Sequence, residues 1–310
     1  MKTLYKVIVI FLIAAMLYTV GGFIAAKCIY DAVFGHRYET SEEDAFDMAD
    51  FPGLMRTEHP FSSNGEHNLA GYLYESEATS ERRGIIIFSH GMGRGGQRGY
   101  IDFFAALAAE GYYVFAYDAT GNDESEGDSV GSLLQGVIDL SSAIDYVKSL
   151  DVAEALPLSL VGYSWGAMSA TNVLCYHDEI DAVVSIAGWN ESRDMIIHKS
   201  KEYVGAFYVT LLPQVGWYEA AMYGKYSECS SLEGLGKTDA RVMIIHGDED
   251  ATIPVEYGYG RYIEKWGDDD DFEFVLLRGR GHNLFEGANG GRNTEMYGDI
   301  LDFLNRSLEK

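Results

Sequence analysis

The 310-residue sequence predicts a doubly wound, mostly parallel α/β sheet with helices on both faces. Short apolar runs of strand length alternate along the chain with longer segments of helical periodicity. In addition, a glycine-flanked serine, Ser164, stands between such a strand and such a helix. There is no internal repeat and no low-complexity run that would indicate another architecture.

The expected strands and helices follow one another regularly. An antiparallel strand over 68–74 begins the sheet, and further strands are expected near 85–89, 112–118, 158–162, 182–186, 241–247 and 272–277. Helical periodicity covers 99–110, 132–149, 165–176, 255–266 and 292–308. Strands that alternate with helices in this way form parallel sheets, with the helices covering both faces.

The amino terminus predicts a transmembrane helix. Val7 to Ala26 is a run of 20 residues without a charge, and at about 1.5 Å per residue it crosses about 30 Å of hydrocarbon. Lys2 and Lys6 precede the run and Lys27 follows it, which favours a cytoplasmic start and an extracytoplasmic domain anchored to the membrane. A signal peptide cleaved near Ala25-Ala26, with secretion of the remainder, is the alternative.

An acidic segment follows the apolar run. Six of the 12 residues from Glu39 to Asp50 are acidic, which is typical of a solvated spacer. We therefore divide the chain into a membrane anchor over 1–28, a juxtamembrane connector over 29–59 and one folded domain over 60–310. The formal net charge of −25 argues against nucleic acid as a partner and favours neutral or cationic substrates over strongly anionic ones.

Ser164 is the candidate nucleophile. It lies in the run Gly162-Tyr163-Ser164-Trp165-Gly166, after an apolar strand and before a helix. Flanking glycines let the strand turn abruptly into the helix and leave the serine Oγ exposed. The pattern alone is weak in a chain with 35 glycines, so the interpretation depends on partner residues.

A serine nucleophile of this kind needs a histidine and a carboxylate, in the chain order serine, acid, histidine. Asp250 is the expected acid, because the strand near 241–247 leads into its loop at the carboxyl edge of the sheet. Asp248 and Glu249 lie in the same loop and are alternatives. Asp250 can also serve only to cap the helix that begins near Pro254.

His282 is the expected base, since it lies on a glycine-rich loop after the last strand. The other histidines that follow Ser164 are His177, His198 and His246. We expect His177 at a solvated helix end and His198 in an inserted segment. His246, at a strand end, is expected to be a hydrogen-bonded structural histidine.

Two backbone N–H groups are expected to bind the oxyanion that forms when the serine attacks a carbonyl. One belongs to Trp165, directly after the nucleophile. The other is assigned to Met92, in the glycine-rich loop 89–96 that follows a strand. His90 in this loop is expected to support it by hydrogen bonding. The glycine spacing of the loop fits neither a dinucleotide site nor a P-loop.

With these residues, the chain resembles α/β hydrolases of the serine aminopeptidase-like and lysophospholipase-like esterase group over roughly residues 60–308. The resemblance rests on His90-Gly91, Asp118 through Ser125, the nucleophile elbow around Ser164, His246-Gly247 with Asp250, and Gly281-His282. One departure occurs at Asp123, where the group has glycine. It leaves the three expected catalytic residues intact but concerns the conformation of the local loop.

One interval between strands is too long for a plain connection. About 50 residues separate Trp189 from the strand at Arg241, whereas such connections usually have about two to six. We expect a helical cap over about 190–238. Its apolar and aromatic residues, expected to shape a substrate pocket or to form the cap's own core, are Met195, Tyr203, Phe207, Tyr208, Trp217, Tyr218, Met222, Tyr223 and Tyr226.

The resemblance implies a serine hydrolase that acts through an acyl-enzyme on a small-molecule or lipid-like ester, as a carboxylesterase or lysophospholipase. A peptidase or amide hydrolase of the same fold is the alternative, and a non-catalytic surface binding protein is the second. No cofactor and no metal are expected, because zinc-helix and calcium-loop spacings are lacking. Cys175 and Cys229 could pair outside the cytoplasm, but we expect them to be free thiols, since Cys175 is predicted to lie in the core.

Overall fold

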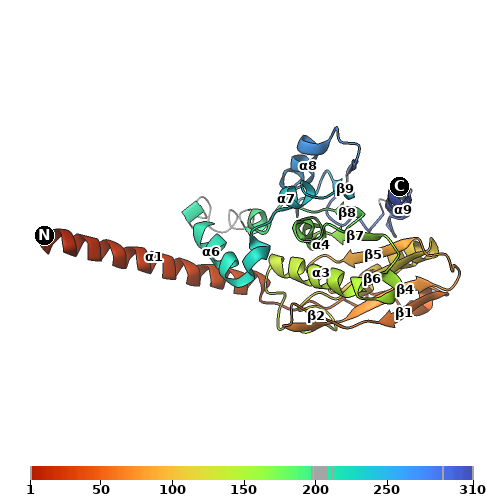
Figure 1. The fold of residues 1–310 in the computed structure, drawn as a ribbon, viewed down its shortest axis with the longest axis horizontal. Coiled ribbons are helices and arrows are strands. Elements are labelled where there is room, and N and C mark those ends of the chain that lie inside the picture. The colour runs from red at the N-terminus through yellow and green to blue at the C-terminus, as the bar shows by residue number, and fades with distance from the viewer. Residues whose placement is uncertain (1, 197, 199–208, 211, 288–289, 309–310) are drawn as a thin grey trace.

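The computed structural model describes residues 2–196, 198, 209–210, 212–287 and 290–308. In these residues an eight-stranded sheet has the order β1-β4-β6-β5-β7-β8-β9-β10 (Figure 1). Its strands are β1 (Leu54–Glu58), β4 (Gly71–Ser76), β5 (Gly84–Ser89), β6 (Tyr112–Tyr117), β7 (Leu158–Tyr163), β8 (Ala182–Ile186), β9 (Arg241–Gly247) and β10 (Phe272–Leu277). β4 is antiparallel to β1 and β6, and the other neighbours are parallel. The predicted mostly parallel sheet with an antiparallel start is confirmed.

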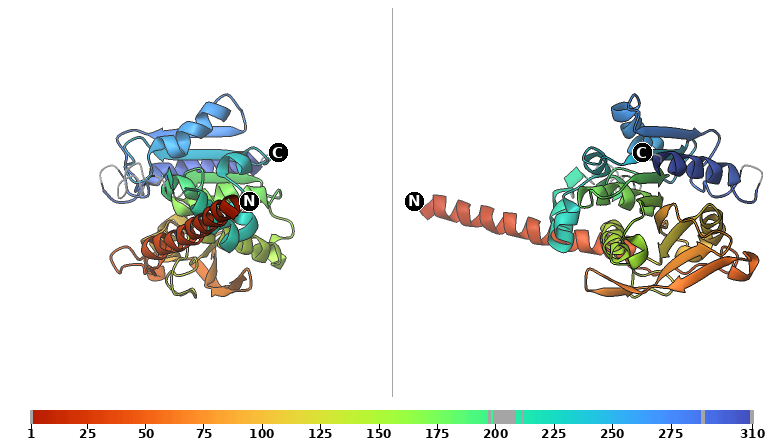
Figure 2. Two further views of the ribbon diagram at one scale, coloured as in Figure 1. Left: turned by 90° about the vertical axis from the view of Figure 1, so that its left-hand side faces the viewer. Right: turned by 45° about the vertical axis from the view of Figure 1, so that its right-hand side comes forward.

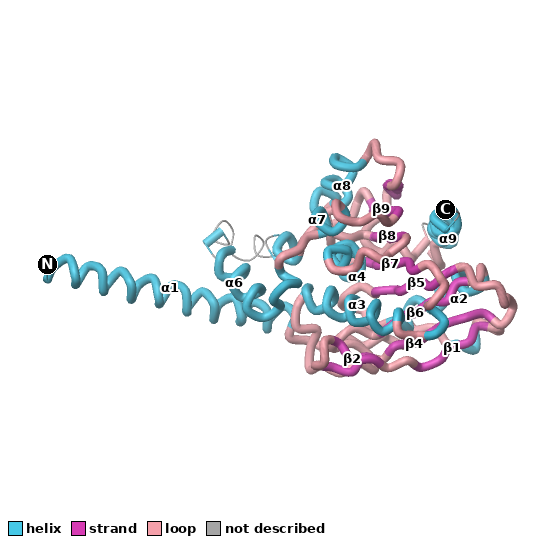
Figure 3. The backbone as a smooth tube through the Cα atoms, viewed as in Figure 1, coloured by secondary structure: helices cyan, strands magenta, loops and turns pink. Residues whose placement is uncertain are grey.

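Helices cover both faces of the sheet (Figure 3). One face carries α2 (Ile101–Ala109) and α9 (Thr294–Leu308), and the other carries α3 (Leu133–Lys148), α4 (Trp165–Asn172) and α8 (Tyr259–Trp266). Side chains of β5 alternate between the two cores, with Ile85 and Ile87 on the α3 side and Ile86 and Phe88 on the α2 side. A strand covered on both faces needs apolar residues at every position, which explains the unbroken apolar run.

The sheet begins earlier in the chain than expected. Strand β1 pairs with β4 from Leu54 to Glu58, inside the segment 29–59 that we expected to be a connector. A short hairpin of β2 (Phe61–Ser63) and β3 (His67–Leu69) follows it. Arg37 Nη2 donates to the carbonyl oxygen of Asp123 at 2.8 Å, so the connector is also tied to the domain.

Helix α1 (Lys2–Phe34) is continuous and projects away from the sheet (Figures 1 and 2). Its most apolar 18-residue window has a mean hydropathy of 2.6 and is 6% buried, which makes it a candidate membrane span near the amino terminus. Its carboxyl-terminal turns pack on the domain, because Ala26, Tyr30 and Phe34 are buried. The helix therefore reaches beyond the apolar run and into the domain core.

The segment inserted between β8 and β9 contains α6 (Leu212–Tyr223) and α7 (Ser231–Leu235). Three of its expected pocket residues, Tyr203, Phe207 and Tyr208, lie outside the described residues.

The expectation of free thiols at Cys175 and Cys229 is wrong. The two form a disulfide with a Cα–Cα distance of 6.5 Å. Helix α4 ends at Asn172, so Cys175 lies in the following 3-10 turn, where it is only partly buried. There it meets the chain returning from the inserted segment. Cys28 is a free, exposed cysteine.

Replacing Cys175 by serine should lower the free energy of unfolding by about 2–4 kcal/mol, because the disulfide restricts the unfolded chain. The bridged residues are 54 positions apart. Guanidinium unfolding followed by circular dichroism measures the change. Cys28→Ser, which removes the exposed thiol, is the control and should leave the unfolding midpoint unchanged. Equal midpoints for both variants would contradict the Cys175–Cys229 bond.

Candidate active site

Strand β7 turns into α4 at Ser164, which has φ 53° and ψ −112°. A positive φ is unfavourable for a residue with a side chain, so the surroundings must hold this turn in place. The Ser164 N–H donates to the carbonyl oxygen of Ile186 at 2.8 Å. A Cβ on Gly162 would overlap the carbonyl oxygen of Gly166, and a Cβ on Gly166 would overlap that of Ser89. The two glycines thus permit close packing of strand, helix and neighbouring loop.

The structure brings Ser164, His282 and Asp250 together. Ser164 Oγ lies 2.8 Å from His282 Nε2, and His282 Nδ1 lies 2.7 Å from Asp250 Oδ2. The three residues follow β7, β10 and β9, which are neighbours or near neighbours in the sheet and end at the same edge. Asp250 is buried, whereas the His282 side chain is 21% exposed.

The Asp250 carboxylate is surrounded by donors. Its Oδ1 accepts the N–H groups of Thr252 at 2.9 Å and Ile253 at 2.8 Å, and His246 Nε2 lies 3.4 Å from Oδ2. Burial by itself raises the pKa of Asp250, but the bonds from His246 and His282 outweigh it and hold the pKa well below its usual range. An ionised Asp250 only accepts hydrogen bonds, so His282 Nδ1 carries the proton and Nε2 accepts from the serine.

The two alternative acids are placed differently. Asp248 Oδ1 accepts the Gly279 N–H at 2.7 Å, and its Oδ2 lies 3.2 Å from Arg278 Nη1. Asp248 therefore fastens the start of the loop that carries His282. Glu249 is exposed. Of the three acids in this loop, Asp250 is the one within hydrogen-bond distance of His282.

His177 is not at a solvated helix end, as expected, but buried. Its Nε2 lies 2.8 Å from Ser141 Oγ on α3. The ring of His198 packs 5.3 Å from that of Tyr257. His246 Nε2 donates to the Ile253 carbonyl at 2.9 Å, in keeping with a structural role, and it also lies beside Asp250.

The glycine-rich loop after β5 passes close to the serine. A Cβ on Gly91 would lie 3.3 Å from the Cβ of Ser164. The next residue is Met92, and Trp165 directly follows the serine at the start of α4. In the described part of the chain, the N–H groups of Met92 and Trp165 donate to no other protein group. Two such donors beside a serine are the requirement for binding an oxyanion.

His90 fixes the conformation of this loop. Its Nδ1 donates to the Gly91 carbonyl at 2.8 Å, and its Nε2 accepts the Ala119 N–H at 2.9 Å. This second bond requires a neutral ring, and burial lowers the pKa of His90 accordingly. His90 therefore supports the loop through hydrogen bonds, as the sequence suggested.

Tyr163 is a supporting residue that the sequence analysis did not identify. Its ring lies 5.5 Å from the ring of His282, and its hydroxyl donates to the His282 carbonyl oxygen at 3.1 Å. The side chain thus holds the histidine from the strand that precedes the serine. Its position next to the nucleophile was the one available signal.

Asp123, the departure from the family pattern, has φ 34°, a conformation that glycine adopts more easily. Its carboxylate accepts the N–H groups of Thr40 at 2.6 Å and Gly96 at 2.9 Å. It thereby links the segment that follows α1 to the loop that contains Met92. Nearby Asp118 accepts the Gln97 N–H at 2.8 Å, and burial raises the pKa of Asp118 to about 7.

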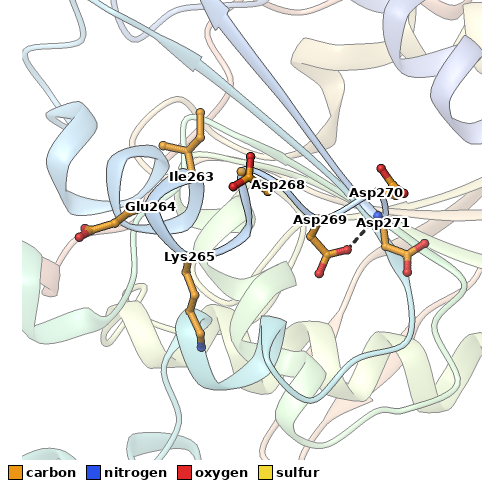
Figure 4. A pocket seen from close by; sticks show the side chains of 8 residues that line it. Ile263, Glu264, Lys265, Asp268, Asp269, Asp270 and Asp271 are labelled. Carbon is orange, nitrogen blue, oxygen red and sulfur yellow. Dashed lines mark hydrogen bonds between the residues drawn. The ribbon is translucent and has the colours of Figure 1, made fainter.

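Of two cavities in the described residues, the smaller adjoins the site and the larger lies elsewhere. One of ≈ 40 Å³ lies beside the Ser164 and His282 loops and is lined by Asp44, Arg94, Gly99, Tyr100, Tyr163, Asn283, Phe285 and Arg292. A larger, open concavity over 263–271 is acidic, and its carboxylates point in different directions (Figure 4). That concavity contains none of the expected catalytic residues. Over the described residues, no cluster of histidine, cysteine and acidic side chains is suited to hold a metal ion.

The sequence matches the model of the serine aminopeptidase family S33 over residues 80–228. No curated protein is similar enough in sequence to count as a relative. An esterase of Pyrococcus furiosus superposes with a TM-score of 0.66 at 16% identity, covering 88% of this chain and 99% of the esterase.

Two further solved structures share the fold. An α/β hydrolase from a Penicillium species has a TM-score of 0.61 at 17% identity, with 83% of this chain and 100% of that chain covered. An acylaminoacyl peptidase of Pyrococcus horikoshii has a TM-score of 0.64 at 18% identity, covering 85% of this chain but 43% of the peptidase. By its sheet order and these structural neighbours, the chain has the α/β-hydrolase fold, and residues 80–228 are similar to the serine aminopeptidase family.

Proposed function

We propose that the protein is a membrane-anchored serine hydrolase that cleaves carboxylic esters through Ser164, His282 and Asp250. The observation that carries the proposal is the hydrogen-bonded series in which Ser164 Oγ lies 2.8 Å from His282 Nε2 and His282 Nδ1 lies 2.7 Å from Asp250. The match of residues 80–228 to the serine aminopeptidase family and the fold shared with a solved esterase support a hydrolase.

In the first half of the proposed reaction, Ser164 Oγ attacks the ester carbonyl while His282 Nε2 accepts its proton. Asp250 keeps the proton of His282 on Nδ1 and stabilises the imidazolium that forms. The negative charge on the carbonyl oxygen is bound by the N–H groups of Met92 and Trp165. A donor of this kind contributes about 3–4 kcal/mol to transition-state stabilisation.

The proton on His282 Nε2 then passes to the leaving alcohol, and the acyl group remains on Ser164. In the second half, His282 accepts a proton from water, the hydroxide attacks the acyl carbonyl, and the serine leaves with that proton. Both halves use the same two oxyanion donors.

Esters are the preferred substrates because alcohols leave more readily than amines. Amide hydrolysis is the second candidate, since a solved acylaminoacyl peptidase shares the fold. The net charge of −25 favours neutral or cationic substrates. Two arginines line the small cavity beside the site, but Arg292 is paired with Asp102 at 3.2 Å, which offsets part of their charge.

We further propose that α1 is a retained membrane anchor and that the catalytic domain is extracytoplasmic. Cleavage near Ala25-Ala26 would remove Phe23, whose ring packs 5.2 Å from that of Tyr218 in the inserted segment. The Cys175–Cys229 disulfide fits an oxidising compartment. Lys2 and Lys6 at the start of the helix favour a cytoplasmic amino terminus.

A fluorophosphonate probe tests the nucleophile. The purified full-length protein should be labelled covalently, and Ser164→Ala should abolish labelling because it removes the attacking oxygen. His282→Ala and Asp250→Asn should each lower turnover of a short-chain nitrophenyl ester by about 10³–10⁴-fold or more. Labelling is read by gel fluorescence and turnover by nitrophenol release.

Asp248→Asn is the matched control, because it changes a neighbouring carboxylate that bonds Gly279 and Arg278 instead of His282. Its turnover should fall far less than that of Asp250→Asn. Folded protein that resists the probe would identify a non-catalytic binder. A strong loss of turnover in Asp248→Asn, together with unchanged turnover in Asp250→Asn, would assign the role of the acid to Asp248.

Acid should selectively remove the stability that Asp250 contributes. The folded-state pKa of Asp250 lies below its unfolded value, so the contribution is complete above about pH 4 and is lost as pH falls toward the folded pKa. The stability difference between wild type and Asp250→Asn should therefore shrink on acidification. Urea unfolding across this range measures it. Asp299→Asn, at an exposed site, should show no such trend, and a difference independent of pH would contradict an ionised Asp250.

Alkaline carbonate extraction tests the anchor. When membranes from cells that produce the full chain are extracted, the protein should remain in the pellet. Its amino-terminal residue should be Met1 or Lys2. A variant that carries a cleavable secretory signal in place of residues 1–28 should be released. Recovery of wild type in the supernatant with a new amino terminus near Ala26 would establish a cleaved signal peptide instead.

A further inference from the structure

Helix α6 of the inserted segment lies along the carboxyl-terminal part of α1 (Figures 1 and 2). The Tyr30 ring lies 4.8 Å from that of Tyr218, and the Tyr30 hydroxyl donates to Glu219 at 2.6 Å. A Cβ on Gly22 would overlap the side chain of Gln214, so a glycine lets the two helices approach closely at this point. The contact therefore extends over several turns of α1.

This contact begins inside the apolar run of α1. Tyr18 donates from its hydroxyl to the carbonyl oxygen of Thr210 at 3.0 Å, and Tyr18 lies eight residues before Ala26, the end of the uncharged run. Eight helical residues correspond to about 12 Å along the helix axis. If α1 spans the bilayer with the run Val7 to Ala26, the start of α6 lies level with the outer part of the membrane.

The exposed side of α6 is unusual for a helix on a water-soluble surface, because it is apolar. Its exposed residues are Pro213, Trp217, Ala220, Ala221 and Met222, of which the first four share one side of the helix. Trp217 is 50% exposed and Met222 57%. The buried side combines the polar residues Gln214 and Glu219 with Val215 and Tyr218. A helix in contact with water would expose its polar residues and bury its apolar ones.

The polar residues on the buried side are accommodated by the protein. Glu219 is the one charged residue of α6, and its Oε1 accepts hydrogen bonds from Tyr30 and from Ser192, each at 2.6 Å. Because this carboxylate points into the domain, the outward side of α6 carries no charge in a chain with a net charge of −25. Val209, which precedes α6, is also exposed.

We propose that the exposed side of α6, with Val209, contacts lipid in the outer leaflet of the bilayer that α1 spans, from the acyl chains at Val209 to the boundary with the headgroups. The inference rests on the membrane anchor proposed above. It commits to lipid because the apolar side continues the exposed apolar surface of α1 and lies at the depth that α1 sets. Exposed tryptophan and apolar side chains on one helix face are what binds helices at this boundary.

Tryptophan quenching by brominated lipid tests the proposal. The full-length protein is reconstituted in phosphatidylcholine vesicles in which one lipid carries bromine near the glycerol end of its acyl chains. Emission should fall on incorporation of this lipid, and most of the fall should be lost in Trp217→Phe. Trp165 and Trp189 are buried, so they should contribute little. Trp266→Phe, which removes a partly exposed tryptophan on α8, is the matched control and should keep the full quenching.

Two accompanying measurements separate the possible failures. Fluorophosphonate labelling of Trp217→Phe should equal that of wild type, because Trp217 is 50% exposed on the outward side of α6 and not in the pocket or cap core expected from the sequence. Carbonate extraction of the vesicles establishes whether α1 is inserted. Inserted protein whose quenching does not depend on Trp217 would overturn the lipid contact alone, whereas protein released by carbonate would overturn the anchor together with it. Concentration-dependent cross-linking of dimers through α6, without Trp217-dependent quenching, would assign this face to a second copy of the chain.

Discussion

The backbone turn at Ser164 is the constraint on which the site depends. A residue with a side chain is held at φ 53° between a buried strand and a buried helix. The turn persists because its N–H is bonded to Ile186 and because Gly162 and Gly166 leave no Cβ between closely packed backbones. This arrangement sets the serine Oγ at the edge of the sheet, where loops from other parallel strands also end.

Hydrogen bonds between loops then determine which groups reach the serine. Asp250 is oriented by two backbone N–H groups and by His246, so that its second oxygen faces His282. His90 fastens the loop of Met92 to Ala119 in the same way. Each bond is individually worth about 0.5–1.5 kcal/mol or somewhat more when charged. Together these bonds hold the groups around Ser164, which come from three loops, in a single arrangement.

Sequence patterns were informative where one local rule decides the structure. The apolar run of β5 and the glycines around Ser164 each predict a local conformation, and the order of loops along a parallel sheet predicts which residues meet. The disulfide and the burial of His177 depend on where distant segments return, which no local pattern encodes. The strand β1 was missed because its neighbourhood is acidic, although its pairing with β4 needs only backbone groups on an edge strand.

In the inserted segment, too, contacts with distant residues decide which side of a helix faces the domain. A helix with alanine, tryptophan and methionine on one side is normally read as packing that side inward. In α6 the apolar side with Trp217 faces outward, while the inward side holds Glu219 together with Val215 and Tyr218. Tyr30 of α1 and Ser192 supply hydrogen-bond partners for Glu219. Burial of a carboxylate is costly unless it is hydrogen-bonded, and here the bonds come partly from the apolar helix itself. Helix α1 therefore contributes to the orientation of α6.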